Sequence, residues 1–100
     1  MAWLRWSEKA IRDLENIYDF IATDSPFYAK VQVERLVAAT ERLKSFPESG
    51  RSLPELPHLP PQELVIGSYR VVYRYEPESE TAFIVTVVHS ARLMKDDLLE

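Results

Sequence analysis

The feature that most constrains the fold of this chain is the stretch Gly67–Arg92, GSYRVVYRYEPESETAFIVTVVHSAR. Two runs rich in aromatic and β-branched residues, Tyr69–Tyr75 and Thr81–His89, flank the polar segment EPESE. Aromatic and β-branched residues favour extended strands, and a short polar segment that contains proline ends a strand. The stretch therefore predicts a β-hairpin. It also gathers three arginines, three tyrosines and a histidine, so we expect any chemistry to use this hairpin.

Two amphipathic helices are predicted before the hairpin. Ser7 is placed to cap a helix over residues 8–22, and Ser25-Pro26 is a typical start for a second helix. The second helix should end near residue 46, because Pro47 disfavours the helical conformation of the residue before it. The first helix has an apolar stripe at helical spacing, made by Ala10, Leu14, Ile17, Tyr18 and Ile21.

Two shorter runs, Ala2–Trp6 and Gln62–Ile66, predict further strands, with an irregular, proline-rich connection at 48–61. The predicted order is β-α-α-β-β-β. Strands that follow helices and are joined by tight turns favour an α+β fold, an antiparallel sheet with the helical hairpin packed on one face. Arg70 and Arg74 alternate with the apolar positions, so we expect them on the face away from the helices. The two shorter strands are candidate exposed edges, and residues 95–100 are expected to form one helical turn or a frayed tail.

Length and composition predict a single domain spanning residues 1–100, with one hydrophobic core. The chain has no cysteine, no signal-peptide pattern and no apolar run long enough for a membrane span, so we expect a cytoplasmic protein. Its net charge of −4 counts against a nucleic acid as the main ligand, because such binders are usually basic.

No familiar catalytic motif is present in the sequence. Two glycines in the whole chain exclude a phosphate-binding glycine loop. Two histidines, His58 and His89, are too few for a histidine-based metal site without help from carboxylates. We therefore expect neither a metal ion nor a cofactor.

The residues that could carry chemistry are cationic and aromatic. They are Arg51, Arg70, Arg74, His89 and Arg92, with Tyr69, Tyr73 and Tyr75. Such arginines could bind a phosphodiester while His89 acts as general acid or base in RNA cleavage. The residues favour a structural interpretation instead: strand arginines on a solvated face paired with glutamates, a hydrogen-bonded His89 closing its strand, Arg92 anchoring the tail, and tyrosines packed in the core.

Four segments in this order resemble the RelE/ParE superfamily of bacterial type II toxins. They are WSEKAIRDLENIYDFIA, SFPESGR, ELVIGSYRVVYRY and IVTVVHSAR, and the resemblance extends from about Trp6 to Arg92. It implies the RelE/ParE-like fold and a toxin that is neutralised by a cognate antitoxin, whose extended and helical segments wrap around it.

The superfamily divides into RelE-like toxins, which cleave messenger RNA on the ribosome, and ParE-like toxins, which inhibit DNA gyrase. The resemblance places Arg70 and Arg92 at catalytic arginines of the ribonucleases, with His89 as a further candidate. A pair of lysines in those enzymes is missing here, Glu63 lies in that stretch, and the tail LMKDDLLE has no tyrosine. These departures favour the ParE-like branch of plasmid-stabilisation toxins, a gyrase-binding protein and not an enzyme. The alternatives are a RelE-like endoribonuclease and a degenerate member that binds only its antitoxin.

Overall fold

The computed structural model describes residues 1–95 and residue 99. Its elements are β1 (Trp3–Trp6), α1 (Glu8–Ala22), α2 (Pro26–Thr40), the 3₁₀ turn η1 (Glu41–Lys44), β2 (Arg51–Ser52), β3 (Gln62–Ile66), β4 (Tyr69–Glu76) and β5 (Thr81–His89). The turn or tail expected at 95–100 lies outside the described residues, apart from its positions 95 and 99. In the described part of the chain, no helix is both long and apolar enough to cross a membrane.

Both predicted helix caps are confirmed. The Ser7 hydroxyl accepts a hydrogen bond from the Ala10 amide at 3.0 Å, and the Ser25 hydroxyl accepts one from the Tyr28 amide at 3.1 Å. The second helix ends earlier than predicted, at Thr40, and continues as the 3₁₀ turn η1. The Thr40 hydroxyl donates to the carbonyl of residue 37, a local bond that competes with regular helix.

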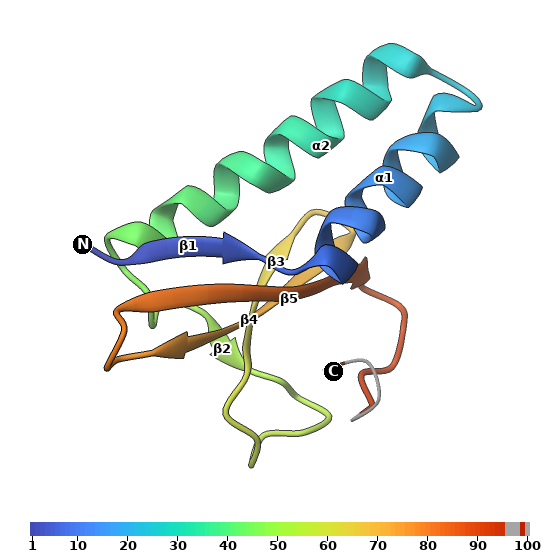
Figure 1. The fold of residues 1–100 in the computed structure, drawn as a ribbon. Helices are drawn as coiled ribbons and strands as arrows, with labels where there is room; N and C mark the ends of the chain where they lie inside the picture. Colours follow the sequence, from blue (N-terminus) through green and yellow to red (C-terminus); the bar gives the residue numbers. More distant parts are fainter. Residues whose placement is uncertain (96–98, 100) are drawn as a thin grey trace.

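The sheet has five strands in the order β1-β5-β4-β3-β2, and the helical hairpin lies on one of its faces (Figure 1). The pairs β5–β4, β4–β3 and β3–β2 are antiparallel, whereas β1 runs parallel to β5 with Trp3 opposite Thr81. The sheet is therefore mixed, and the expectation of an antiparallel sheet is wrong for β1. No tight turn joins β1 to β5, so hairpin geometry does not dictate its direction.

The two edges of the sheet differ from each other. β1 is an outer strand, as predicted. The prediction that Gln62–Ile66 forms the other edge is only half right, because β2 pairs with its first two residues. β2 lies within the connection that the sequence indicated to be irregular.

The main core lies between the helices and the sheet. Val71 and Tyr73 of β4 are fully buried there against Leu36 of α2 and Leu43 of η1. Tyr69 and Tyr75 pack at the margin of this core, which confirms the packing role predicted for the hairpin tyrosines.

A second, smaller core lies on the face away from the helices, which we call the second face. It consists of Leu53, Val72, Val85, Val88 and Met94, with Leu56 packed against it. Leu53 and Leu56 belong to the loop between β2 and β3, and Met94 belongs to the segment after β5. The loop and this C-terminal segment therefore cover part of the second face, which the sequence predicted to be solvated.

Candidate functional site

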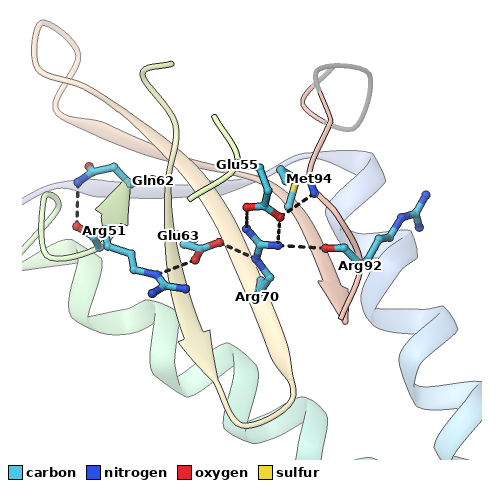
Figure 2. A network of polar contacts seen from close by, with 8 residues as sticks. Arg51, Glu55, Gln62, Glu63, Arg70, Arg92 and Met94 are labelled. Carbon is cyan, nitrogen blue, oxygen red and sulfur yellow. Dashed lines mark hydrogen bonds and ion pairs between the residues drawn. The ribbon is translucent and has the colours of Figure 1, made fainter. Parts of the chain in front are cut away.

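Arg70 lies on the second face, as its alternation with Val71 predicted, but its side chain is buried. Only 5% of the residue is exposed. Its Nε donates to Glu63 Oε1 at 2.7 Å, and its Nη1 and Nη2 donate to Glu55 Oε2 and Oε1 at 2.7 and 2.6 Å (Figure 2). Nη1 also donates to the Arg92 carbonyl at 3.0 Å. These bonds use four of the five N–H donors of the guanidinium.

Glu63 of β3 connects Arg70 to a second arginine. Its carboxylate is fully buried, and its Oε2 accepts from Arg51 Nε at 2.7 Å (Figure 2). Arg51 belongs to β2 and lies directly opposite Glu63 in the strand register. The Gly50 carbonyl beside it accepts from the side-chain Nε2 of Gln62 at 2.9 Å, which connects β2 to β3.

We call Arg51, Glu63, Arg70 and Glu55 the charge quartet. Two positive and two negative groups alternate along it, so its formal charge is zero. Burial of a charge is tolerated when the charge is paired and hydrogen-bonded, and Arg70 and Glu63 meet this condition together.

Glu55 comes from the loop between β2 and β3 and completes the quartet. Its Oε2 accepts from the Met94 amide at 2.9 Å as well as from Arg70. The hydrogen bond from Arg70 lowers the pKa of Glu55 to about 2, although partial burial opposes this effect. Reciprocally, the pKa of Arg70 is raised, first by the bond to Glu55 and then by Glu63, with burial acting the other way. One carboxylate thus joins the loop, the sheet and the C-terminal segment.

His89 and Arg92 lie at another surface. His89 closes β5, its exposed ring contacts Tyr69 edge-on at 5.7 Å between centroids, and its Nδ1 accepts from the Ala91 amide at 3.1 Å. With Phe20 of α1, both residues line a shallow depression of about 430 Å³ on the helix side of the sheet. The Arg92 side chain points away from Arg70, which contacts only the backbone carbonyl of Arg92 (Figure 2). The structure therefore does not bring the three candidate side chains together.

Arg74 fits the structural interpretation of the strand arginines. It is exposed, forms an ion pair with Glu76, and holds its guanidinium carbon 4.7 Å from the centre of the Phe83 ring. His58 is exposed in the loop between β2 and β3. Within residues 1–95 and 99, no three His, Cys, Asp or Glu side chains are grouped closely enough to hold a metal ion.

Sequence reasoning missed Glu55. One signal for it was present: in the segment LPELP, Leu53 and Leu56 flank Glu55, which is typical of a loop that packs on an apolar surface. Local sequence spacing does not predict the contact between Glu55 and Arg70, because Glu55 lies in a loop and Arg70 in a separate strand.

The fold of this chain, a helical hairpin on one face of a five-stranded mixed sheet, is that of the RelE/ParE toxins. The chain belongs to the ParE toxin family: the family model described as "ParE toxin of type II toxin-antitoxin system, parDE" matches residues 4–94. The chain is thus a type II toxin of the ParE/RelE family, and the resemblance predicted from its sequence is confirmed.

Known relatives come from both branches of the superfamily. Toxin RelE2 of Caulobacter vibrioides is 35% identical over 97 residues, which cover 93% of this chain and 100% of the relative. Among solved structures, the chromosomal ParDE toxin–antitoxin system from P. aeruginosa matches with a TM-score of 0.74 at 24% identity, over 89% of this chain and 96% of that one. The toxin–antitoxin complex RelBE2 from Mycobacterium tuberculosis matches with a TM-score of 0.60 at 25% identity, over 88% and 96%.

Proposed function

We propose that this toxin acts in the ParE manner: it binds and inhibits DNA gyrase without catalysing a reaction, and a cognate antitoxin neutralises it. The observation that carries the proposal is the hydrogen bonding of the Arg70 guanidinium. A ribonuclease of this fold would need that guanidinium to hold a phosphodiester. Three of its five N–H donors instead bind two carboxylates of the same chain, and a fourth binds the Arg92 carbonyl.

The charge around Arg70 supports the same conclusion. A nuclease site stabilises developing negative charge with preorganised cations. Here the quartet is neutral, and Glu63 places a fully buried negative charge beside the arginine. His89 and Arg92 could not assist at Arg70 from where they lie, because their side chains line the depression on the helix side.

A protein partner is supported by the exposed apolar side chains of the helical hairpin. Phe20 near the end of α1 and Phe27 at the start of α2 are 78% and 77% exposed. Phe20 also lines one depression together with Tyr28, which is 56% exposed. Exposed aromatic side chains grouped on a small protein support a contact surface for another protein. The RelBE2 relative was solved as a toxin–antitoxin complex, so we assign the antitoxin to this chain as well.

Two reactions with antitoxin-free protein test the proposal. In one, the protein is added to a gyrase supercoiling assay; in the other, it is added to ribosomes translating a defined messenger RNA. We expect inhibited supercoiling and intact messenger RNA. Codon-dependent cuts with normal supercoiling would contradict the proposal and favour the RelE-like alternative, and inactivity in both assays would indicate a member that only binds its antitoxin.

Arg92→Ala is the control variant for both assays. Its exposed side chain lies outside the quartet, and Arg70 uses its backbone carbonyl, so the substitution spares the network. Under the proposed function, neither the wild-type protein nor Arg92→Ala cleaves RNA. An Arg92-dependent cleavage of RNA by the wild-type protein would speak for catalysis.

A further inference from the structure

The loop between β2 and β3 is held on the second face by the carboxylate of its own Glu55. We propose that the end of the Arg70 guanidinium is a preformed oxyanion site, which the Glu55 carboxylate fills while it also accepts from the Met94 amide. Glu55 thereby latches the loop and the C-terminal segment onto the sheet. When this carboxylate is removed, a small carboxylate anion such as formate binds in its place.

Three donors converge on the Glu55 carboxylate. Arg70 Nη1 and Nη2 meet its two oxygens at 2.7 and 2.6 Å, and the Met94 amide meets Oε2 at 2.9 Å. The two-pronged arrangement is the geometry in which a guanidinium binds carboxylates most strongly, and the added amide is a typical further donor to an anion.

The Arg70 donors keep their places without Glu55. Arg70 Nε is bound to the fully buried Glu63, and Nη1 also donates to the Arg92 carbonyl at 3.0 Å. A side chain held at Nε and buried to 95% in a strand has few other rotamers to adopt. The guanidinium part of the site is therefore held by residues other than its occupant, Glu63 and the Arg92 carbonyl.

Charge provides the attraction for an external anion. With Glu55 present, the charge quartet is neutral; without it, two arginines face one glutamate and the quartet carries a charge of +1. Glu63 alone then compensates two arginines, so an anion that reaches the vacancy stabilises the fold. Glu55→Ala removes a methylene and a carboxylate group, which together have the size of acetate, from a side chain that is 23% exposed.

The first test uses Glu55→Ala and thermal unfolding in sodium chloride against sodium formate at equal ionic strength. We expect formate at about 0.1 M to raise the midpoint of Glu55→Ala by roughly 7 °C, if it binds with a dissociation constant on the order of 10 mM. Wild-type protein should not respond, because its site is filled. Phosphate serves as a second anion, and a response to either anion supports an oxyanion site.

The double variant Glu55→Ala/Arg70→Gln is the matched control, since it lacks the guanidinium donors and the uncompensated charge. A formate response that survives in this variant would overturn the proposal, as would a folded Glu55→Ala protein that responds to neither anion.

A second variant keeps the proposal testable if Glu55→Ala does not fold. Glu55→Gln preserves shape but places an amide against the guanidinium and weakens the bond to Met94. We expect hydrogen exchange at the Met94 amide to become at least about tenfold faster, because the C-terminal segment is released. The Val87 amide, bound to Asp13 at 3.0 Å, is the internal reference and should not change. Unchanged exchange at Met94 in folded Glu55→Gln would refute the latch. None of these measurements involves gyrase, so their outcome is independent of the proposed function.

Discussion

At the scale of single residues, Gly50 lies where no side chain fits. A Cβ there would be 2.7 Å from the Glu63 carbonyl oxygen and 2.7 Å from two atoms of the Tyr73 ring and hydroxyl. The Gly50 amide also donates to the Tyr73 hydroxyl at 2.8 Å, and burial raises the pKa of that hydroxyl. Gly67 is constrained differently: its φ of +58° favours glycine, yet a Cβ would meet only the end of the Arg35 side chain at 3.6 Å.

The two glycines can therefore be compared directly. Gly67→Ala should lower the free energy of unfolding by about 1 kcal/mol, the cost of a left-handed backbone with a side chain. Gly50→Ala should cost more, about 2–3 kcal/mol, because Tyr73 or the backbone of β3 must move. Urea denaturation of both variants measures the difference. Equal costs would contradict the steric argument.

At the scale of elements, α1 serves as a continuation of the sheet edge. β1 pairs with β5 only as far as residue 84. Beyond this residue, side chains from the start of the helix form the hydrogen bonds to β5. The Ser7 hydroxyl, besides capping α1, donates to the Val85 carbonyl at 2.9 Å. Asp13 accepts from the Val87 amide at 3.0 Å and from the Thr86 hydroxyl, and it forms an ion pair with Lys9.

This role predicts a large effect at Asp13. Asp13→Ala leaves the Val87 amide and the buried Thr86 hydroxyl without their acceptor, so we expect a loss of about 2–3 kcal/mol in the free energy of unfolding. Asp19→Ala is the control on the same helix; Asp19 is exposed, and its substitution should stay within about 0.5 kcal/mol of wild type. Chemical denaturation compares the two. A similar small effect at both positions would show that the helix does not depend on this clamp.

The elements that the sequence predicted well are those with local signals. Ser7 and Ser25 correctly predicted where the helices begin. The alternation around Val71 correctly assigned Arg70 to the second face. The parallel pairing of Trp3 with Thr81 was missed, because no local pattern encodes contacts between such distant residues. The burial of Arg70 was missed for the same reason: it depends on a proline-rich loop without periodicity, which brings Glu55 to the sheet from outside.

At the scale of the whole molecule, one sheet separates two hydrophobic cores. The segments that cover the second core are held by the Glu55–Arg70 ion pair as well as by apolar packing. The pKa of Glu55 falls from 4.5 to about 2 in the folded protein. A carboxyl whose folded pKa is depressed contributes stability above its unfolded pKa and loses it as the pH falls toward the folded value. The stabilisation from Glu55 is therefore complete above about pH 5 and decreases between pH 4.5 and 2.

Acid should consequently destabilise the wild-type protein more than Glu55→Gln. Between pH 6 and pH 3, we expect the wild type to lose about 2 kcal/mol through this group alone, whereas Glu55→Gln lacks this contribution. Glu76→Gln is the control, because Glu76 pairs with Arg74 at the surface and should leave the pH dependence intact. Urea midpoints at the two pH values give the comparison. Parallel pH profiles for wild type and Glu55→Gln would argue against the lowered pKa.

The parallel pairing of β1 with β5 also bears on how the toxin is made. During translation, β1 leaves the ribosome early and finds its hydrogen-bonding partner only when residues 81–84 have been synthesised. β4, too, lacks its longest neighbour until then. A chain interrupted before Thr81 cannot complete the sheet, so its apolar strands have no fold to bury them. We therefore expect fragments that end before Thr81 to stay unfolded and sensitive to proteases.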